Sequence, residues 1–172
     1  MDQSTTSACN AYSAEFLNAV RRVLADEGGD SSNPADAGGL TRFGISTRAY
    51  PGVDIATLTR DAAVKIYWDE WWVRFGFAQL PAAVAAKTFD LAVNMGAGSA
   101  IECLQRALRA SGMPVTEDGA LGPATASAAA RAEPAVLMAA MRSEFAAHYR
   151  LVAAKQNRDQ AFLKGWLNRA YA

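Results

Sequence analysis

Residues 27–46 read EGGDSSNPADAGGLTRFGIS, and this stretch interrupts a sequence that is otherwise patterned as helix. It holds five glycines and one proline, residues that favour turns over helix interiors. Two carboxylates and a hydroxyl, those of Glu27, Asp36 and Thr41, are spaced along it. Polar turn residues are usually connectors, so an acid, a second acid and a hydroxyl around one turn suggest a site.

Apolar residues recur at helical spacing on both sides of this stretch. Before it, the helical pattern is carried by Phe16, Leu17, Val20, Val23 and Leu24. After it, Thr59 and Pro81 begin two further patterns, and Gly96 ends the second. Only Leu40, Phe43 and Ile45 alternate as a short hairpin would. The prediction is a mainly α fold with one small β-hairpin.

The amino-acid composition argues against several classes of function. The chain has 172 residues, of which 51% are hydrophobic and 20% charged, as in globular proteins. A net charge of zero argues against a dedicated nucleic-acid partner. No run approaches the roughly 20 apolar residues of a membrane span, so stable membrane insertion is not expected. Two cysteines and one histidine lack zinc-site spacing, and neither a metal nor a cofactor is expected.

Two features of composition leave alternatives open. Residues 142–172 hold six basic and two acidic side chains. This basic segment faces an anionic polymer, or it reflects the preference of helix ends for Lys and Arg. Free thiols are expected for Cys9 and Cys103, with a disulfide between them as the alternative. The first residues lack a basic segment followed by an apolar core, so synthesis in the cytoplasm is expected.

Glu27 follows a helical pattern directly. The carbonyls at a helix C-terminus disfavour an ionised carboxylate, and a glutamic acid kept neutral is able to protonate a leaving oxygen. The alternative is a solvated glutamate at a helix end. Asp36 alone fits a turn former and Thr41 alone a strand residue. If Asp36 and Thr41 face Glu27 across a cleft, they can hold the water molecule that glycosidic hydrolysis needs.

The stretch resembles the N-terminal signature of glycoside hydrolase family 108, the phage and bacterial N-acetylmuramidases. The spacing of Glu27, Asp36 and Thr41 is similar to that of the Glu/Asp/Thr triad of phage-type lysozymes. The similarity continues in AVKIYWDEWW (63–72), FDLAVNMG (89–96), LQRAL (104–108), DGALGPAT (118–125) and FLKGWLNR (162–169). One departure is Asp30, where members of the family tend to have an aromatic residue. The resemblance implies a lysozyme-like fold with the hairpin beside the catalytic cleft, and a C-terminal peptidoglycan-binding region.

We therefore expect a flexible tail over residues 1–12, a catalytic part over 13–80 and a helical peptidoglycan-binding part over 81–172, packed as one compact unit. Tyr67, Trp71 and Asn94 are candidate substrate-binding residues, although Asn94 fits equally a cap of its own helix. Three tryptophans lie within residues 68–72. They cannot all face one way on a helix, so at least one is expected in the core.

The resemblance implies a monomeric endolysin that hydrolyses the β-1,4 bond between N-acetylmuramic acid and N-acetylglucosamine. Glu27 would be its general acid, and Asp36 and Thr41 would position water. Peptidoglycan glycan strands would be its partner. It would be made in the host cytoplasm and would reach the wall once a holin opens the membrane. The alternatives are a lytic transglycosylase, in which no water is added, and a non-catalytic wall-binding or secretion-assisting module.

Overall fold

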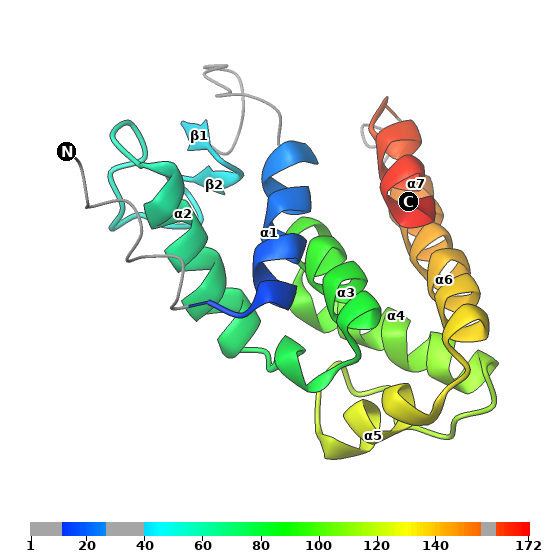
Figure 1. Cartoon of the computed structure of the whole chain (residues 1–172). Coiled ribbons are helices and arrows are strands. Elements are labelled where there is room, and N and C mark those ends of the chain that lie inside the picture. The colour runs from blue at the N-terminus through cyan, green and yellow to red at the C-terminus, as the bar shows by residue number, and fades with distance from the viewer. Residues whose placement is uncertain (1–11, 27–39, 156–160) are drawn as a thin grey trace. The chain divides into compact units, whose positions relative to one another are not determined.

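A computed structural model describes residues 12–26, 40–155 and 161–172 of the chain. The chain divides into two compact units, Met1–Arg74 and Phe75–Ala172. In the described residues, the regular elements are helices apart from one two-stranded antiparallel sheet (Figure 1). The predicted fold class, mainly α and lysozyme-like with one small β-hairpin, is confirmed. The predicted boundary between residues 80 and 81 stays a prediction.

The first unit begins with helix α1, Ala14–Asp26. The Ser13 hydroxyl accepts a hydrogen bond from the backbone N–H of Phe16 at 3.2 Å, as expected for a helix cap. Phe16, Val20 and Val23 are buried, which confirms the helical spacing seen in the sequence. Their shared face packs into the core of this unit.

Helix α2, Arg60–Tyr67, is capped by Thr59, whose hydroxyl accepts from the N–H of Ala62 at 3.2 Å. A π-helical turn, η1, continues it over Trp68–Val73. Trp72 is fully buried, and its ring centroid lies 5.5 Å from that of Phe16. At least one of the three tryptophans is therefore in the core, as predicted.

The hairpin joins β1, Thr41–Arg42, to β2, Ile45–Ser46, with Arg42 opposite Ile45. Its two-residue turn is Phe43-Gly44, with φ angles of 53° and 77°. Two positive φ angles are what the tight type I′ hairpin turn requires. Glycine adopts this conformation freely, whereas Phe43 is strained in it.

The second unit begins with a short 3-10 turn, η2 (Phe77–Gln79), followed by helices α3 (Ala82–Met95) and α4 (Ala97–Ala110). Gly96 separates the two helices with a φ of 89°, a conformation that favours glycine. Thr88 and Phe89 of α3 and Leu104 and Leu108 of α4 are completely buried. The two helices therefore share one core.

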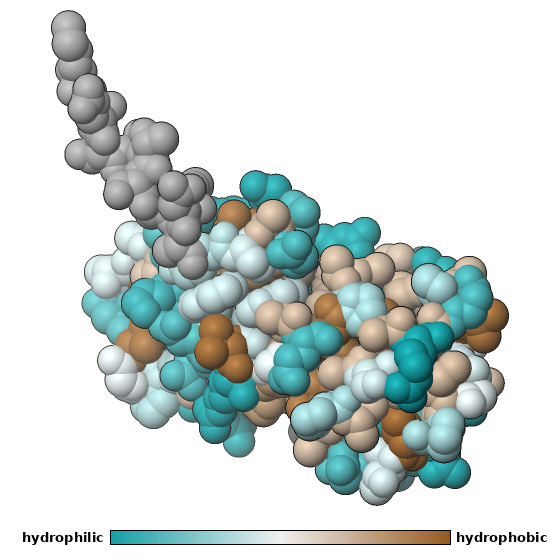
Figure 2. All heavy atoms as spheres, turned by 60° about the horizontal axis from the view of Figure 1, so that its bottom comes forward, coloured by the Kyte–Doolittle hydropathy of each residue, from teal (hydrophilic) through white to brown (hydrophobic). Residues whose placement is uncertain are grey.

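Three further helices complete this unit: α5 (Pro123–Arg131), α6 (Pro134–Lys155) and α7 (Leu163–Tyr171). Helix α6 packs against both α4 and α7 (Figure 1). No helix in the described ranges combines the length and apolar character that crossing a membrane demands. On the face that Figure 2 shows, hydrophobic residues form small separate patches among polar ones. Single exposed apolar residues of this kind are normal on globular proteins.

Candidate active site and C-terminal clusters

Glu27 and Asp36 lie outside the described residues, so their predicted roles are tested by no contact or distance. The described part of α1 runs to Asp26, and the hairpin begins at Thr41. Both elements belong to the first unit. In sequence, the two carboxylates thus fall between a helix and a two-stranded hairpin.

Thr41 is the first residue of β1 and pairs with Ser46 of β2. Its side chain is half-buried, so its position is fixed by the hairpin. The hairpin is closed further by Thr47, whose N–H and hydroxyl both donate to the carbonyl oxygen of Leu40, at 3.0 and 3.1 Å. A hydroxyl on a paired strand is held more precisely than one on an open loop.

Arg42, a residue that sequence reasoning did not select, holds the hairpin to a neighbouring loop. The Arg42 guanidinium donates to the carbonyl oxygen of Ala56 at 3.0 Å. The same group lies 5.3 Å from the centre of the Phe43 ring, within cation–π range. The adjacent loop is shaped by Asp54, which accepts hydrogen bonds from the Ala56 N–H and the Thr57 hydroxyl. No periodic pattern marks Arg42, because it acts through contacts distant in sequence.

Tyr67 joins α2 to the hairpin through its side chain. Its side chain is 1% exposed, and its hydroxyl donates to the carbonyl oxygen of Phe43 at 3.0 Å. This bond links α2 to the strained turn residue of the hairpin. The bond gives Tyr67 a part in positioning the hairpin. Substrate binding by Tyr67 stays a prediction.

Trp71 is half-buried in η1. Its indole N–H donates to the hydroxyl oxygen of Tyr50 at 2.9 Å, and Tyr50 follows the hairpin in sequence. Part of the ring remains accessible, so stacking on a sugar stays a prediction for Trp71. No local pattern pointed to Tyr50, which lies 21 residues from its partner.

Asn94 lies near the end of α3 in the second unit and is exposed. Its side-chain oxygen accepts a hydrogen bond from the Tyr149 hydroxyl at 2.7 Å. Tyr149 in turn stacks on Trp166, with ring centroids 5.3 Å apart, and Trp166 stacks on Phe162 at 6.0 Å. Burial raises the pKa of Tyr149 well above its ordinary value, so its hydroxyl stays a donor. Substrate binding by Asn94 stays a prediction.

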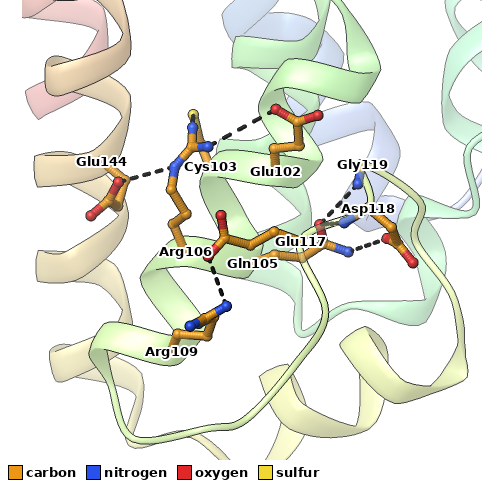
Figure 3. A network of polar contacts seen from close by, with 9 residues as sticks. All are labelled: Glu102, Cys103, Gln105, Arg106, Arg109, Glu117, Asp118, Gly119 and Glu144. Atoms are coloured by element: carbon orange, nitrogen blue, oxygen red, sulfur yellow. Dashed lines mark hydrogen bonds and ion pairs between the residues drawn. The ribbon is translucent and has the colours of Figure 1, made fainter.

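Two polar clusters on α4 are shown in Figure 3. In the first, Arg106 pairs with Glu144 of α6 at 3.3 Å and approaches Glu102 at 3.9 Å. It also donates to the sulfur of Cys103 at 3.1 Å. Cys103 is a buried free thiol, and burial raises its pKa.

The second cluster is built around Gln105, which is completely buried. Its amide nitrogen donates to a carboxylate oxygen of Asp118 at 2.7 Å, and its amide oxygen accepts from the N–H groups of Asp118 and Gly119, both at 3.0 Å. Hydrogen bonds from the Ala120 N–H and from Gln105 lower the pKa of Asp118. Gln105 therefore fixes the turn of DGALGPAT against α4.

In the basic C-terminal segment, some side chains are exposed and others contact the rest of the second unit. Arg169 pairs with Asp90 of α3 at 3.5 Å, and each side chain is only 11% exposed. The Lys87 ammonium donates to the Arg169 carbonyl oxygen at 2.7 Å. Arg169 thus anchors α7 to α3 and does not face a polymer. Lys155 and Lys164 are exposed.

Comparison with known proteins gives the family. Residues 20–96 match the model of Glycosyl hydrolase 108, and residues 99–171 match that of a Predicted Peptidoglycan domain. None of the curated proteins compared with the chain matches it. Among solved structures, the chain is similar to "Structure of Brucella abortus SagA", with 27% identity and a TM-score of 0.73. That match covers 90% of this chain and 88% of the other. The chain therefore joins a glycosyl hydrolase 108 region to a C-terminal peptidoglycan domain, the combination of a hydrolase that acts on peptidoglycan.

Proposed function

We propose that this protein is an N-acetylmuramidase, which hydrolyses the β-1,4 bond between N-acetylmuramic acid and N-acetylglucosamine in peptidoglycan. The observation that carries the proposal is the glycosyl hydrolase 108 match over residues 20–96, which contains Glu27, Asp36 and Thr41. The peptidoglycan domain match over residues 99–171 supports the choice of substrate. The strained and anchored hairpin that carries Thr41 supports a site at this end of the first unit.

In the proposed mechanism, Glu27 protonates the glycosidic oxygen as the bond breaks. Its place directly after α1 favours the neutral acid, since helix C-termini disfavour negative charge. Asp36 and Thr41 hold the attacking water on the opposite face of the sugar. Thr41 orients this water through a hydroxyl that the paired strands keep in place. The reaction then inverts the configuration at the anomeric carbon.

The Glu27→Gln variant tests the assignment of the general acid. Glutamine has the shape of the acid without its proton, so the variant should fold normally and clear peptidoglycan about 10²–10⁴-fold more slowly. The measurement is loss of turbidity of outer-membrane-stripped cells, with circular dichroism as the control for folding. Clearing at the wild-type rate by a folded Gln variant would exclude Glu27 as the acid.

The products of the wild-type protein separate the proposal from its rivals. Mass spectrometry should find reducing muramic acid ends, each heavier by one water than the anhydro ends of a transglycosylase. A wall-binding or secretion-assisting module would bind sacculi and release no fragments. Anhydro ends among the products would end the muramidase proposal. Binding to sacculi with no released fragments would end it as well.

The stereochemistry of the product tests Asp36 and Thr41. The inverting arrangement needs two carboxyl groups about 6.5–9.5 Å apart, whereas retention needs about 5–5.5 Å. Proton NMR should show the α-anomer as the first product. Asp36→Asn should slow clearing less than Glu27→Gln, because Thr41 still orients the water. The double variant Asp36→Asn/Thr41→Ala should approach the Glu27→Gln defect. An initial β-anomer would mean that the water-positioning role is wrong.

We further propose that the protein acts as a monomeric endolysin made in the cytoplasm of a host bacterium. The absence of a spanning helix in the described ranges is compatible with release through a holin-formed lesion. Cytoplasmic expression should be tolerated until a membrane permeabiliser is added, and lysis should follow. Spontaneous lysis in the absence of holin and permeabiliser would contradict this route.

A further inference from the structure

A pocket of about 390 Å³ opens between α4 and α6 of the second unit. It is lined by Glu102, Arg106, Glu144, Ala147, His148, Leu151, Val152 and Lys155. Those from α6 recur at the spacing of a single helix face. Ligand pockets have volumes of about 300–1,000 Å³, so this one suits a group of a few residues rather than a polymer.

One end of the pocket carries a negative cluster. Arg106 lies 3.3 Å from Glu144 and 3.9 Å from Glu102 (Figure 3), so one cation is shared between two carboxylates and one negative charge is in excess. The three side chains are between 30% and 48% exposed. They are therefore accessible to a ligand and suited to an ammonium group.

The other end carries a positive charge. Lys155 lies eleven residues beyond Glu144, about 16 Å along a helix axis. Its side chain is exposed, and with the residues that the structure describes it makes no hydrogen bond or ion pair. A carboxylate of a ligand would be its natural partner.

The residues between these ends are apolar or neutral. Leu151 is 63% exposed and gives the lining an accessible apolar side chain. Ala147 and Val152 lie beside it in the lining. Burial, together with the nearby Arg106 guanidinium, lowers the pKa of His148, so its ring is neutral at pH 7. Apart from this imidazole the lining has no aromatic ring for stacking on a sugar.

We propose that this pocket binds the peptide stem of peptidoglycan, with an ammonium group at the Glu102–Glu144 end and a carboxylate at Lys155. Stem peptides carry both charges, on a diamino acid and at free carboxyl groups, and their alanine methyl groups match the apolar wall. The glycan lacks the ammonium group. The proposal rests on the proposed function only in taking peptidoglycan as the target.

A soluble peptide tests the pocket without any glycosidic bond, so loss of hydrolysis cannot imitate failure of the pocket. The probe is the synthetic tetrapeptide N-acetyl-L-Ala-γ-D-Glu-diaminopimelyl-D-Ala, in which the diaminopimelyl ammonium is the one free amine, titrated into the full chain and followed by calorimetry and by amide NMR. Binding should shift resonances within residues 102–106 and 144–155. Lys155→Glu should weaken it about tenfold or more. The matched charge reversal Lys164→Glu, at an exposed lysine of α7 outside the pocket, should change it by less than about twofold.

Changes to the peptide test both charged ends independently of any variant. Acetylation of the free ammonium group and amidation of the terminal carboxyl group should each weaken binding. A peptide-free N-acetylglucosamine oligomer should leave the pocket resonances unshifted. The proposal is overturned if the tetrapeptide does not bind at millimolar concentration, if the two lysine variants lose affinity equally, or if the glycan oligomer shifts the same resonances. Clearing of cells by the wild-type protein, measured separately, decides the hydrolase proposal.

Discussion

At the scale of single residues, the hairpin shows how a strained backbone is held beside a site. Phe43 adopts a φ of 53°, a region that is unfavourable for a residue with a β-carbon by about 1–2 kcal/mol. The Tyr67 hydroxyl binds its carbonyl oxygen, and Arg42 contacts its ring. These contacts keep the turn closed, and with it the strand that presents Thr41.

The Tyr67→Phe variant should separate this positioning role from sugar binding. Loss of one hydrogen bond should lower the free energy of unfolding by about 0.5–1.5 kcal/mol, and slow clearing by loosening the hairpin. The effect should fall on kcat more than on KM, because the buried ring does not touch substrate. Urea unfolding and clearing kinetics measure both.

Tyr171→Phe is the control for this change. Tyr171 is 49% exposed, and its hydroxyl accepts from Arg150 in the second unit. Removal of that exposed contact should leave stability and clearing nearly unchanged. A rise in KM at constant kcat for Tyr67→Phe would return Tyr67 to the substrate-binding role.

At the scale of elements, a buried amide ties a turn to a helix. Gln105 of α4 satisfies two consecutive backbone donors of the loop before α5. Gly119 in that loop has a φ of 67°, and an added β-carbon would lie 3.3 Å from the carbonyl oxygen of Gly98. The loop therefore lies close against the start of α4 and depends on the amide for its hydrogen bonds.

Replacement of Gln105 by Ala should be strongly destabilising. Each backbone donor that stays buried without a partner costs about 1–3 kcal/mol, and a cavity is added. Arg109→Ala is the matched control on the same helix, because its pair with Glu117 is exposed and worth about 1 kcal/mol or less. Thermal unfolding should rank the two in that order. An equal loss of thermal stability in the two variants would show that water replaces the hydrogen bonds of the Gln105 amide.

At the scale of the whole molecule, the two compact units each have a core of their own. The second unit contains five of the helices and the residues that match the peptidoglycan domain. Leu104, Leu137, Met141 and Phe145 are among its fully buried residues. Arg169 closes it by joining α7 to α3. These features are those expected of a part that folds independently.

A fragment of residues 75–172 should therefore unfold cooperatively on heating and be retained on purified sacculi without releasing fragments. Calorimetry and a sedimentation assay measure these properties, and the full-length Glu27→Gln variant serves as the control for binding without hydrolysis. A fragment without a cooperative transition would show that the second unit needs the first to fold. A folded fragment that stays in solution would place wall binding elsewhere.

The sequence alone determined the helices, because apolar spacing and capping residues act locally. Thr59 caps the helix expected of it, and Gly96 ends α3. The small hairpin and the family were also recognisable, since both rest on glycine-rich turns and motifs contiguous in sequence. Glu27, Asp36 and Thr41 were selected on the same basis, as residues close together along the chain.

The contacts between side chains far apart in sequence could be seen only in the folded chain. The sequence suggests a helix cap for Asn94 and sugar contact for Tyr67, and it counts Arg169 among the basic residues of 142–172 without indicating a partner for it. In the folded chain these residues contact Tyr149, Phe43 and Asp90. The charged ends of the α4–α6 pocket likewise come from helices separated by two turns and α5. Such contacts depend on how helices pack, and packing has no signature in the spacing of any one of them.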